Sequence, residues 1–176
     1  MTDVDCAASL PDLLEPGLSV IFCGINPGMR AASTGHHFEG RNNRFWRVMH
    51  LAGFTPEQIL PEDDHTVLQY GCGLTTVVPR PTARAAELSR AEIELAGDAF
   101  QLKIEQYAPR YVAFLGKMAF SAISRTPNVE WGLQARPFGG ARAWVLPNPS
   151  GLNRGFDLHA LVAAYREVRV AVASMP

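Results

Sequence analysis

Four short apolar runs predict buried strands. They cover residues 18–25, 73–78, 111–116 and 141–147. Each run is nearly continuous rather than alternating, and the first is rich in β-branched and aromatic residues. A continuous run of this kind is typical of a strand that is buried on both faces of a parallel sheet.

Segments between the runs carry apolar residues at helical spacing. Residues 42–53 have Asn42 or Asn43 to cap their start and Gly53 to end them. Ser89 and Glu92 form a capping box, so a helix should follow to about Tyr107. Three further helices are predicted, at 63–70, 116–124 and 157–174.

Alternating strands and helices predict an α/β fold, with three αβα layers and a central, mainly parallel, four-stranded sheet. We expect one domain over 1–176, in which 1–17 is a loose or short helical lead-in. Residues 29–41 are rich in glycine, serine and histidine, and this composition favours an ordered loop.

Composition excludes several classes of protein. The 176 residues suit one domain, and a hydrophobic content of 47% excludes wholesale disorder. No apolar stretch approaches the roughly 20 residues that cross a bilayer, so we expect no membrane partner. The beginning of the chain carries acids and no Lys or Arg, which disfavours a secretory signal and favours the cytoplasm. Three cysteines without a CxxC pair predict neither a disulfide framework nor a metal site.

Charge is distributed unevenly although the formal net charge is only −1. All but two of the 16 basic residues are arginine, whose planar guanidinium suits fixed phosphate contacts. The ranges 21–50 and 134–154 contain several arginines and a single acid, Glu39. This pattern indicates a positive face. Dispersed, solvated charges would give the same composition.

Two loops stand out because each follows a predicted strand. GINPG at 24–28 and NPSGLNR at 148–154 both contain an Asn-Pro pair and a glycine. Ligands of parallel sheets bind at the carboxyl ends of the strands. We therefore expect the two loops to form walls of one cleft.

Three side chains in or near these loops could bind a ligand or take part in a reaction. Asn26 could position a nucleophilic water, although a turn asparagine that bonds its own backbone is the alternative. Phe38 could stack on a planar base or lie in the core. Leu152 could be a wedge into a base stack with Arg154 on a phosphate, or it could fold back onto the closing helix.

Taken together, GINPG, GHHFEGRNNRFW at 35–46 and NPSGLNR resemble the mismatch-specific uracil-DNA glycosylase and thymine-DNA glycosylase family of the uracil-DNA glycosylase superfamily. The similarity runs from about Ser19 to Val170. It implies base flipping and hydrolysis of the N-glycosidic bond of uracil mispaired with guanine in duplex DNA. Thymine, ethenocytosine and other modified pyrimidines are implied as further substrates.

The resemblance also implies a base pocket with Asn26 as the catalytic residue. Asn26 would position the water that attacks the sugar C1′, and Phe38 would stack on the flipped base. His37 points toward the thymine-active branch, and Ala31 would set the space near C5 of the base. The other residues that would face the base are Ile25, Thr75, Asn148 and Ser150.

In the second loop, the resemblance implies that Leu152 is the wedge that fills the space left in the duplex by the flipped nucleotide. Gly151 and Asn153 would face the opposite guanine, and Arg154 would contact DNA. No lysine stands at the motifs, so the product would be an abasic site without strand cleavage. We read Lys117 as a phosphate contact. The implied enzyme is a cytoplasmic monomer that associates with the nucleoid through its function, and it uses neither a cofactor nor a metal.

Better-known uracil glycosylases carry an Asp in the first motif and a His in the last, and both positions are Asn here. We therefore expect slow chemistry, with the option of an assisting carboxylate. The candidates by availability are Glu39, Asp63, Asp64 and Glu94. The alternative function is a non-catalytic domain of the same fold that binds damaged DNA. A small-molecule enzyme is disfavoured because no GxGxxG or GKS/GKT motif is present.

Overall fold

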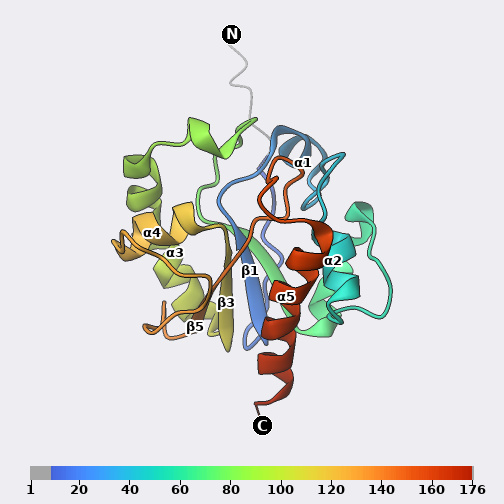
Figure 1. Ribbon diagram of the computed structural model, residues 1–176. Coiled ribbons are helices and arrows are strands. Elements are labelled where there is room, and N and C mark those ends of the chain that lie inside the picture. Colours follow the sequence, from blue (N-terminus) through green and yellow to red (C-terminus); the bar gives the residue numbers. More distant parts are fainter. Residues whose placement is uncertain (1–8, 176) are drawn as a thin grey trace.

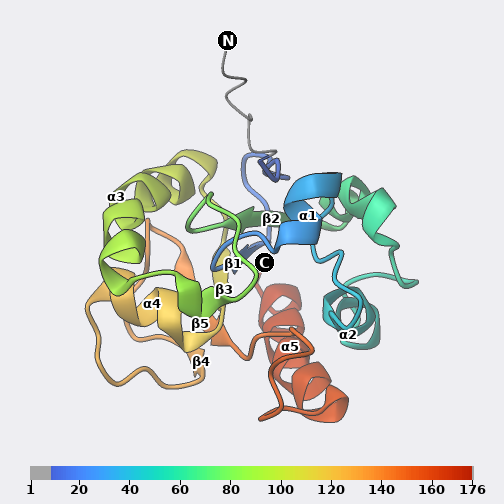
Figure 2. The same cartoon turned by 90° about the horizontal axis from the view of Figure 1, so that it is seen from above.

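A computed structural model describes residues 9–175. Its centre is a five-stranded sheet with helices on both faces (Figures 1 and 2). The strands, in their order across the sheet, are β2 (Cys72–Thr76), β1 (Val20–Gly24), β3 (Tyr111–Leu115), β5 (Arg142–Leu146) and β4 (Gly132–Leu133). All pairings are parallel except that of β4 with β5. The predicted α/β fold with a mainly parallel sheet is therefore confirmed.

Helices cover the two faces in pairs. The α-helices are α1 (Met29–Thr34), α2 (Phe45–Leu51), α3 (Arg90–Tyr107), α4 (Lys117–Ser124) and α5 (Leu158–Ala173). Contacts join α3 to α4 and α2 to α5, and Figure 2 shows these pairs on opposite sides of the sheet. Two 3₁₀ helices, η1 (Pro61–Tyr70) and η2 (Ala85–Glu87), complete the structure.

Several elements differ from the sequence-based expectation. Residues 29–34 form α1 rather than a loop, because Met, Arg and Ala are good helix formers and Gly35 ends the helix in the left-handed conformation. The segment 63–70 is part of a 3₁₀ helix. The sheet has a fifth strand, because β4 is a two-residue antiparallel pair too short to give an apolar run.

The lead-in is only partly described. Its first residues, with Cys6, lie outside the described range. The described part is extended rather than helical, since Leu13 exchanges two backbone hydrogen bonds of 2.9 Å with Leu74 at the edge of β2. This pairing covers part of an otherwise open sheet edge.

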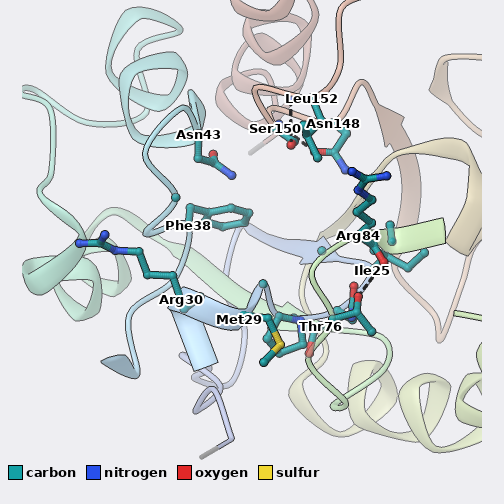
Figure 3. A pocket seen from close by; sticks show the side chains of 18 of the residues that line it. Ile25, Met29, Arg30, Phe38, Asn43, Thr76, Arg84, Asn148, Ser150 and Leu152 are labelled. Atoms are coloured by element: carbon teal, nitrogen blue, oxygen red, sulfur yellow. Dashed lines mark hydrogen bonds between the residues drawn. The ribbon is translucent and has the colours of Figure 1, made fainter. Parts of the chain in front are cut away.

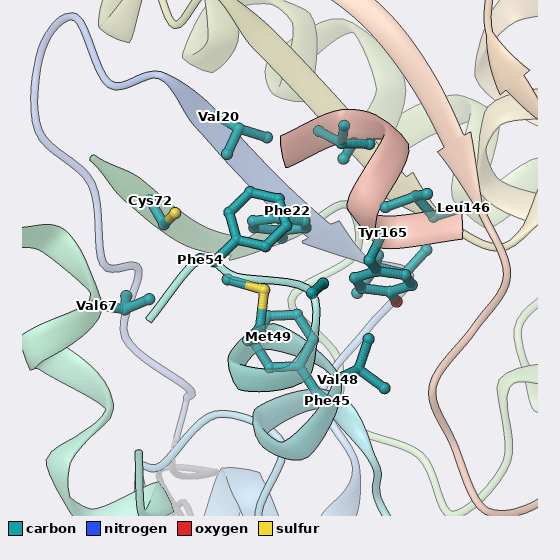
Figure 4. Close-up of a cluster of buried hydrophobic side chains, with 14 of the residues drawn as sticks. Val20, Phe22, Phe45, Val48, Met49, Phe54, Val67, Cys72, Leu146 and Tyr165 are labelled. Carbon is teal, nitrogen blue, oxygen red and sulfur yellow. The ribbon is translucent and has the colours of Figure 1, made fainter. Parts of the chain in front are cut away.

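The core lies on both faces of the sheet because side chains of β1 alternate between them. Phe22 points to the α2–α5 side, where it meets Phe45 and Phe54 edge-to-face and Tyr165 in a stacked arrangement (Figure 4). Ile21 belongs to the other cluster, beneath α3 and α4. No helix within residues 9–175 is both long and apolar enough to cross a membrane.

Replacing Gly73 with alanine should destabilise the fold. A Cβ at Gly73 would lie 2.6 Å from Cδ1 of Leu18 and 2.9 Å from the carbonyl oxygen of Leu13. Overpacking of this kind costs about 1–3 kcal/mol, measurable as a lower midpoint in thermal unfolding. Gly24→Ala is the matched control in β1, because its Cβ would meet nothing closer than 3.8 Å. Equal midpoints for the two variants would contradict this account.

Candidate active site

A cleft of about 570 Å³ opens at the carboxyl ends of β1, β3 and β5 (Figure 3). Its lining includes Gly24 at the end of β1 and residues 25–31 that follow it, as well as Asn148, Ser150, Leu152 and Asn153 after β5. The two Asn-Pro loops are thus walls of one cleft, although about 120 residues separate them in the chain. A volume of this size is typical of a small-molecule site.

The carboxamide of Asn26 is held from one side. Its Nδ2 donates hydrogen bonds of 2.8 Å to the carbonyl oxygen of Arg80 and to Oγ1 of Thr82. The Thr82 hydroxyl in turn donates to the carbonyl oxygen of Arg84, 2.8 Å away. Both amide hydrogens are therefore used, while Oδ1 has no hydrogen-bond donor among residues 9–175 and stays free to accept one.

The partners of Asn26 come from a segment that runs beside the first loop. Backbone N–H groups of Val77 and Val78 donate to the carbonyl oxygens of Gly24 and Ile25, beyond the end of the β1–β2 ladder. Farther along, Thr82 N–H donates to the Pro27 carbonyl oxygen. This pairing carries the parallel strands past their ends and fixes the position of residues 80–82 against Asn26.

Phe38 forms a flat wall of the cleft. Its φ of 56° is in the left-handed region, which is unfavourable for a bulky residue and so must be held by contacts. One ring face stacks on Phe45, with centroids 3.8 Å apart and planes at 19°. The ring extends into the cleft, as Figure 3 shows.

His37 and Asp64 hold the backbone next to Phe38. The buried Asp64 carboxylate accepts a 2.8 Å bond from the His37 N–H, and Trp46 Nε1 donates to the His37 carbonyl oxygen. His37 Nε2 lies 2.7 Å from the carbonyl oxygen of Pro11, which requires Nε2 to carry the proton. Burial lowers the pKa of His37 below its usual value, more than its hydrogen bond to Pro11 raises it. The imidazole is therefore neutral at pH 7 and tied to the lead-in.

The four candidate acids lie in different places. Glu39 lines the cleft, where it accepts hydrogen bonds from Thr34 and Arg30. The Thr34 hydrogen bond, followed by the Arg30 contacts, holds the pKa of Glu39 below its ordinary value, so this carboxylate is ionised. The structure does not bring the other three into the cleft: Asp64 is buried beside His37, Asp63 is exposed on η1, and Glu94 pairs with Arg90 on α3.

Three predicted base contacts come from the first loop, α1 and β2. Ile25 and Ala31 are buried and line the cleft. Thr75 does not line it, because its side chain points to the other face of the sheet, where its hydroxyl donates to Asp12 Oδ1 at 2.6 Å. The next residue, Thr76, lines the cleft instead.

The second loop is held by its own polar groups. Asn148 Oδ1 accepts from the Ser150 N–H, and Ser150 Oγ accepts from the Leu152 N–H. Asn153 uses both ends of its amide within the loop: Nδ2 donates to the Asn148 carbonyl oxygen and Oδ1 accepts from the Gly155 N–H. Asn148 Nδ2 has no acceptor among the described residues and remains an available donor.

Leu152 stands out from this loop, with 75% of its surface exposed. It does not fold back onto α5. Gly151 lies against Asn42 rather than in the cleft lining, and Arg154 is exposed at the end of the loop. The structure therefore places an exposed aliphatic side chain at the rim of the cleft that Asn26 also lines.

Sequence reasoning missed several residues of this site. Thr82, Arg84 and Met29 line the cleft, and none of them was singled out. The signal that could have found them is the segment PRPTAR (79–84), in which two prolines directly follow a predicted strand and suggest a fixed loop at the carboxyl edge. Within residues 9–175, no group of three or more His, Cys, Asp or Glu side chains could hold a metal ion.

Comparisons with known proteins identify the family and the fold. The family model of the uracil DNA glycosylase superfamily matches residues 11–169, which is most of the chain. The fold is also similar to a solution NMR structure of a candidate uracil DNA glycosylase from Methanosarcina acetivorans. The TM-score is 0.62 at 20% identity, and the match covers 93% of this chain and 98% of the other. The chain therefore belongs to the uracil DNA glycosylase superfamily, whose enzymes are glycosidases of DNA base excision repair.

Proposed function

We propose that this DNA glycosylase hydrolyses the N-glycosidic bond of uracil mispaired with guanine in duplex DNA and leaves an abasic site. The observation that carries the proposal is the carboxamide of Asn26, a residue that lines the cleft: its Nδ2 is fixed by Arg80 and Thr82, while its Oδ1 accepts no hydrogen bond from residues 9–175. An amide held in this way can orient a water but is a poor base. It therefore suits a reaction in which the leaving group departs largely by itself.

In the proposed reaction, the bond between C1′ and the base nitrogen breaks first, and the electron pair leaves with the base. The water on Asn26 Oδ1 then adds its oxygen to the cationic C1′ and releases a proton, which neutralises the uracil anion in solvent. Donors that face the base favour the anion as it forms. Asn148 Nδ2 is an available donor in the cleft wall.

Base recognition would rest on the apolar walls of the cleft. The Phe38 ring, backed by Phe45, offers a face on which a pyrimidine can stack. Ile25 and Ala31 would bound the base, and the space beside Ala31 would decide whether the 5-methyl group of thymine enters. Ethenocytosine and other modified pyrimidines are further candidate substrates.

The target base must leave the stack before its C1′ can be reached. Leu152 would enter the gap, and an apolar wedge of this kind stabilises an unstacked step. Flipping costs least for a mispaired base, which favours uracil opposite guanine. We propose Arg154 as a DNA contact next to this wedge, and a monomer acting on cytoplasmic DNA.

Asn26→Ala should reduce excision by at least about 100-fold, since the attacking water loses its acceptor. The measurement is single-turnover release of uracil from a G·U duplex, read as strand breaks after alkali. Gln106→Ala is the matched control, because it removes an exposed amide on α3, outside the cleft lining. Wild-type protein that binds the duplex yet gives no alkali-labile site would favour the non-catalytic binding domain. Retained activity in Asn26→Ala would instead direct attention to Glu39.

Thr82→Val should lower excision by about tenfold with little change in binding. Valine has the shape of threonine but lacks the hydroxyl that accepts from Asn26 Nδ2 and donates to the Arg84 carbonyl oxygen. Asn26 would keep only its bond to Arg80, and its carboxamide would turn more freely. The measurement is kcat against KM on the same duplex. A change confined to KM would contradict the assigned role.

Leu152→Ala should lower the rate of excision from a G·U duplex by about tenfold, because the flipped state loses the side chain that fills the gap in the base stack. The side chain is 75% exposed, so the midpoint of thermal unfolding should not move. Leu95→Ala on α3 is the control, since Leu95 is also exposed and lies outside the cleft lining. Equal rates of excision by wild type and Leu152→Ala would show that Leu152 does not act as a wedge.

A further inference from the structure

One guanidinium gathers the carbonyl groups of the second loop. Arg44 Nη1 donates to the Phe156 carbonyl oxygen at 2.7 Å, and Nη2 donates at 2.9 Å to those of Ser150 and Asn153. Nε and the backbone N–H of Arg44 both donate to the Pro149 carbonyl oxygen, at 3.3 and 3.1 Å. Four carbonyl groups spread over residues 149–156 thus converge on one side chain.

The backbone of the loop also lies directly against the residues before α2. A Cβ at Gly151 would be 2.5 Å from Cβ of Asn42 and 2.7 Å from its carbonyl oxygen. Only glycine allows the loop to approach so closely. The contact with residues 42–44 therefore has two parts, a polar clamp on both sides of Leu152 and a close backbone approach beside it.

Arginine fits this position for a physical reason. Its planar guanidinium offers five N–H donors in a fixed geometry, and it has no acceptor that would compete for them. Lysine keeps the charge, but its compact ammonium on a flexible stem cannot reproduce this spread of donors. The internal bonds of Asn148, Ser150 and Asn153 shape the loop, whereas Arg44 ties that shape to α2.

We propose that Arg44 is a positioning residue for strand penetration: it holds the 149–156 loop so that Leu152 stands at the rim of the cleft. This inference rests on the proposed function, because it requires that Leu152 enters DNA. Arg44 itself does not line the cleft. Its effect on excision must therefore pass through the loop, and most of that effect should be lost when Leu152 is already absent.

A double-mutant cycle tests this dependence. Single-turnover excision of uracil from a G·U duplex is measured for wild type, Arg44→Lys, Leu152→Ala and the double variant. We expect each single variant to be slower by about tenfold and the double variant to be no more than about twofold slower than Leu152→Ala alone. If the two substitutions acted independently, their separate tenfold losses would multiply to about a hundredfold loss of the excision rate.

Arg169→Lys is the matched control. Arg169 also donates from its guanidinium to a backbone carbonyl, that of Gly53 at 2.9 Å, but on α5 and outside the cleft lining. Its excision rate should equal that of wild type. Gly151→Ala is the second variant, because the three atoms nearest to its Cβ all belong to Asn42, so the Cβ pushes the loop away from that residue and leaves the Arg44 side chain unchanged. It should reproduce the loss seen in Arg44→Lys.

The outcomes are distinguishable. Wild-type protein that releases no uracil would overturn the proposed function. Wild-type activity together with an unimpaired Arg44→Lys, an unimpaired Leu152→Ala or a multiplicative double variant would overturn the positioning role alone. If Arg44→Lys and Gly151→Ala both fail to fold, as judged by thermal unfolding, the contact is a folding contact and the inference is also overturned.

Discussion

The parallel pairing of β1, β3 and β5 is the constraint on which the site depends. In this ladder Phe22 is opposite Ala113, and Ala113 is opposite Trp144, so the three strands end at one edge of the sheet. Because β3 alone separates β1 from β5, the loops that leave these two strands meet across a single cleft. Burial of the strands on both faces makes this spacing rigid, so the loops need to supply only chemistry.

Hydrogen bonds within the protein hold the polar groups of the cleft in fixed orientations. Asn26 uses its donors on Thr82 and Arg80, which leaves an acceptor for water. Phe38 has an unfavourable backbone conformation, and the Asp64 carboxylate that bonds its neighbour helps to hold it there. A preorganised site of this type needs no strong base, provided that the leaving group is stable and the target base can be held outside the stack.

Much of this could be predicted from the sequence, because apolar runs specify buried strands and the Asn-Pro loops follow them directly. The gaps have physical reasons. Thr75 and Thr76 are adjacent and alike, and only the register of β2 shows that the second faces the cleft. Asp64 was read as a possible assisting acid, but its buried contact with the His37 N–H is a long-range packing event that no local pattern encodes. The clamp by Arg44 is equally non-local, since its four carbonyl acceptors lie more than 100 residues away.

The central claim is that Asn26 directs a water to C1′ of a flipped uracil while Leu152 fills the gap. A crystal structure with a duplex that carries a non-hydrolysable 2′-fluoro uracil nucleotide opposite guanine would test it most directly. The account predicts the uracil against Phe38, a water between Asn26 Oδ1 and C1′, and Leu152 within the base stack. A uracil that stays stacked in the duplex, or a flipped one with Leu152 in solvent and no water on Asn26, would contradict it.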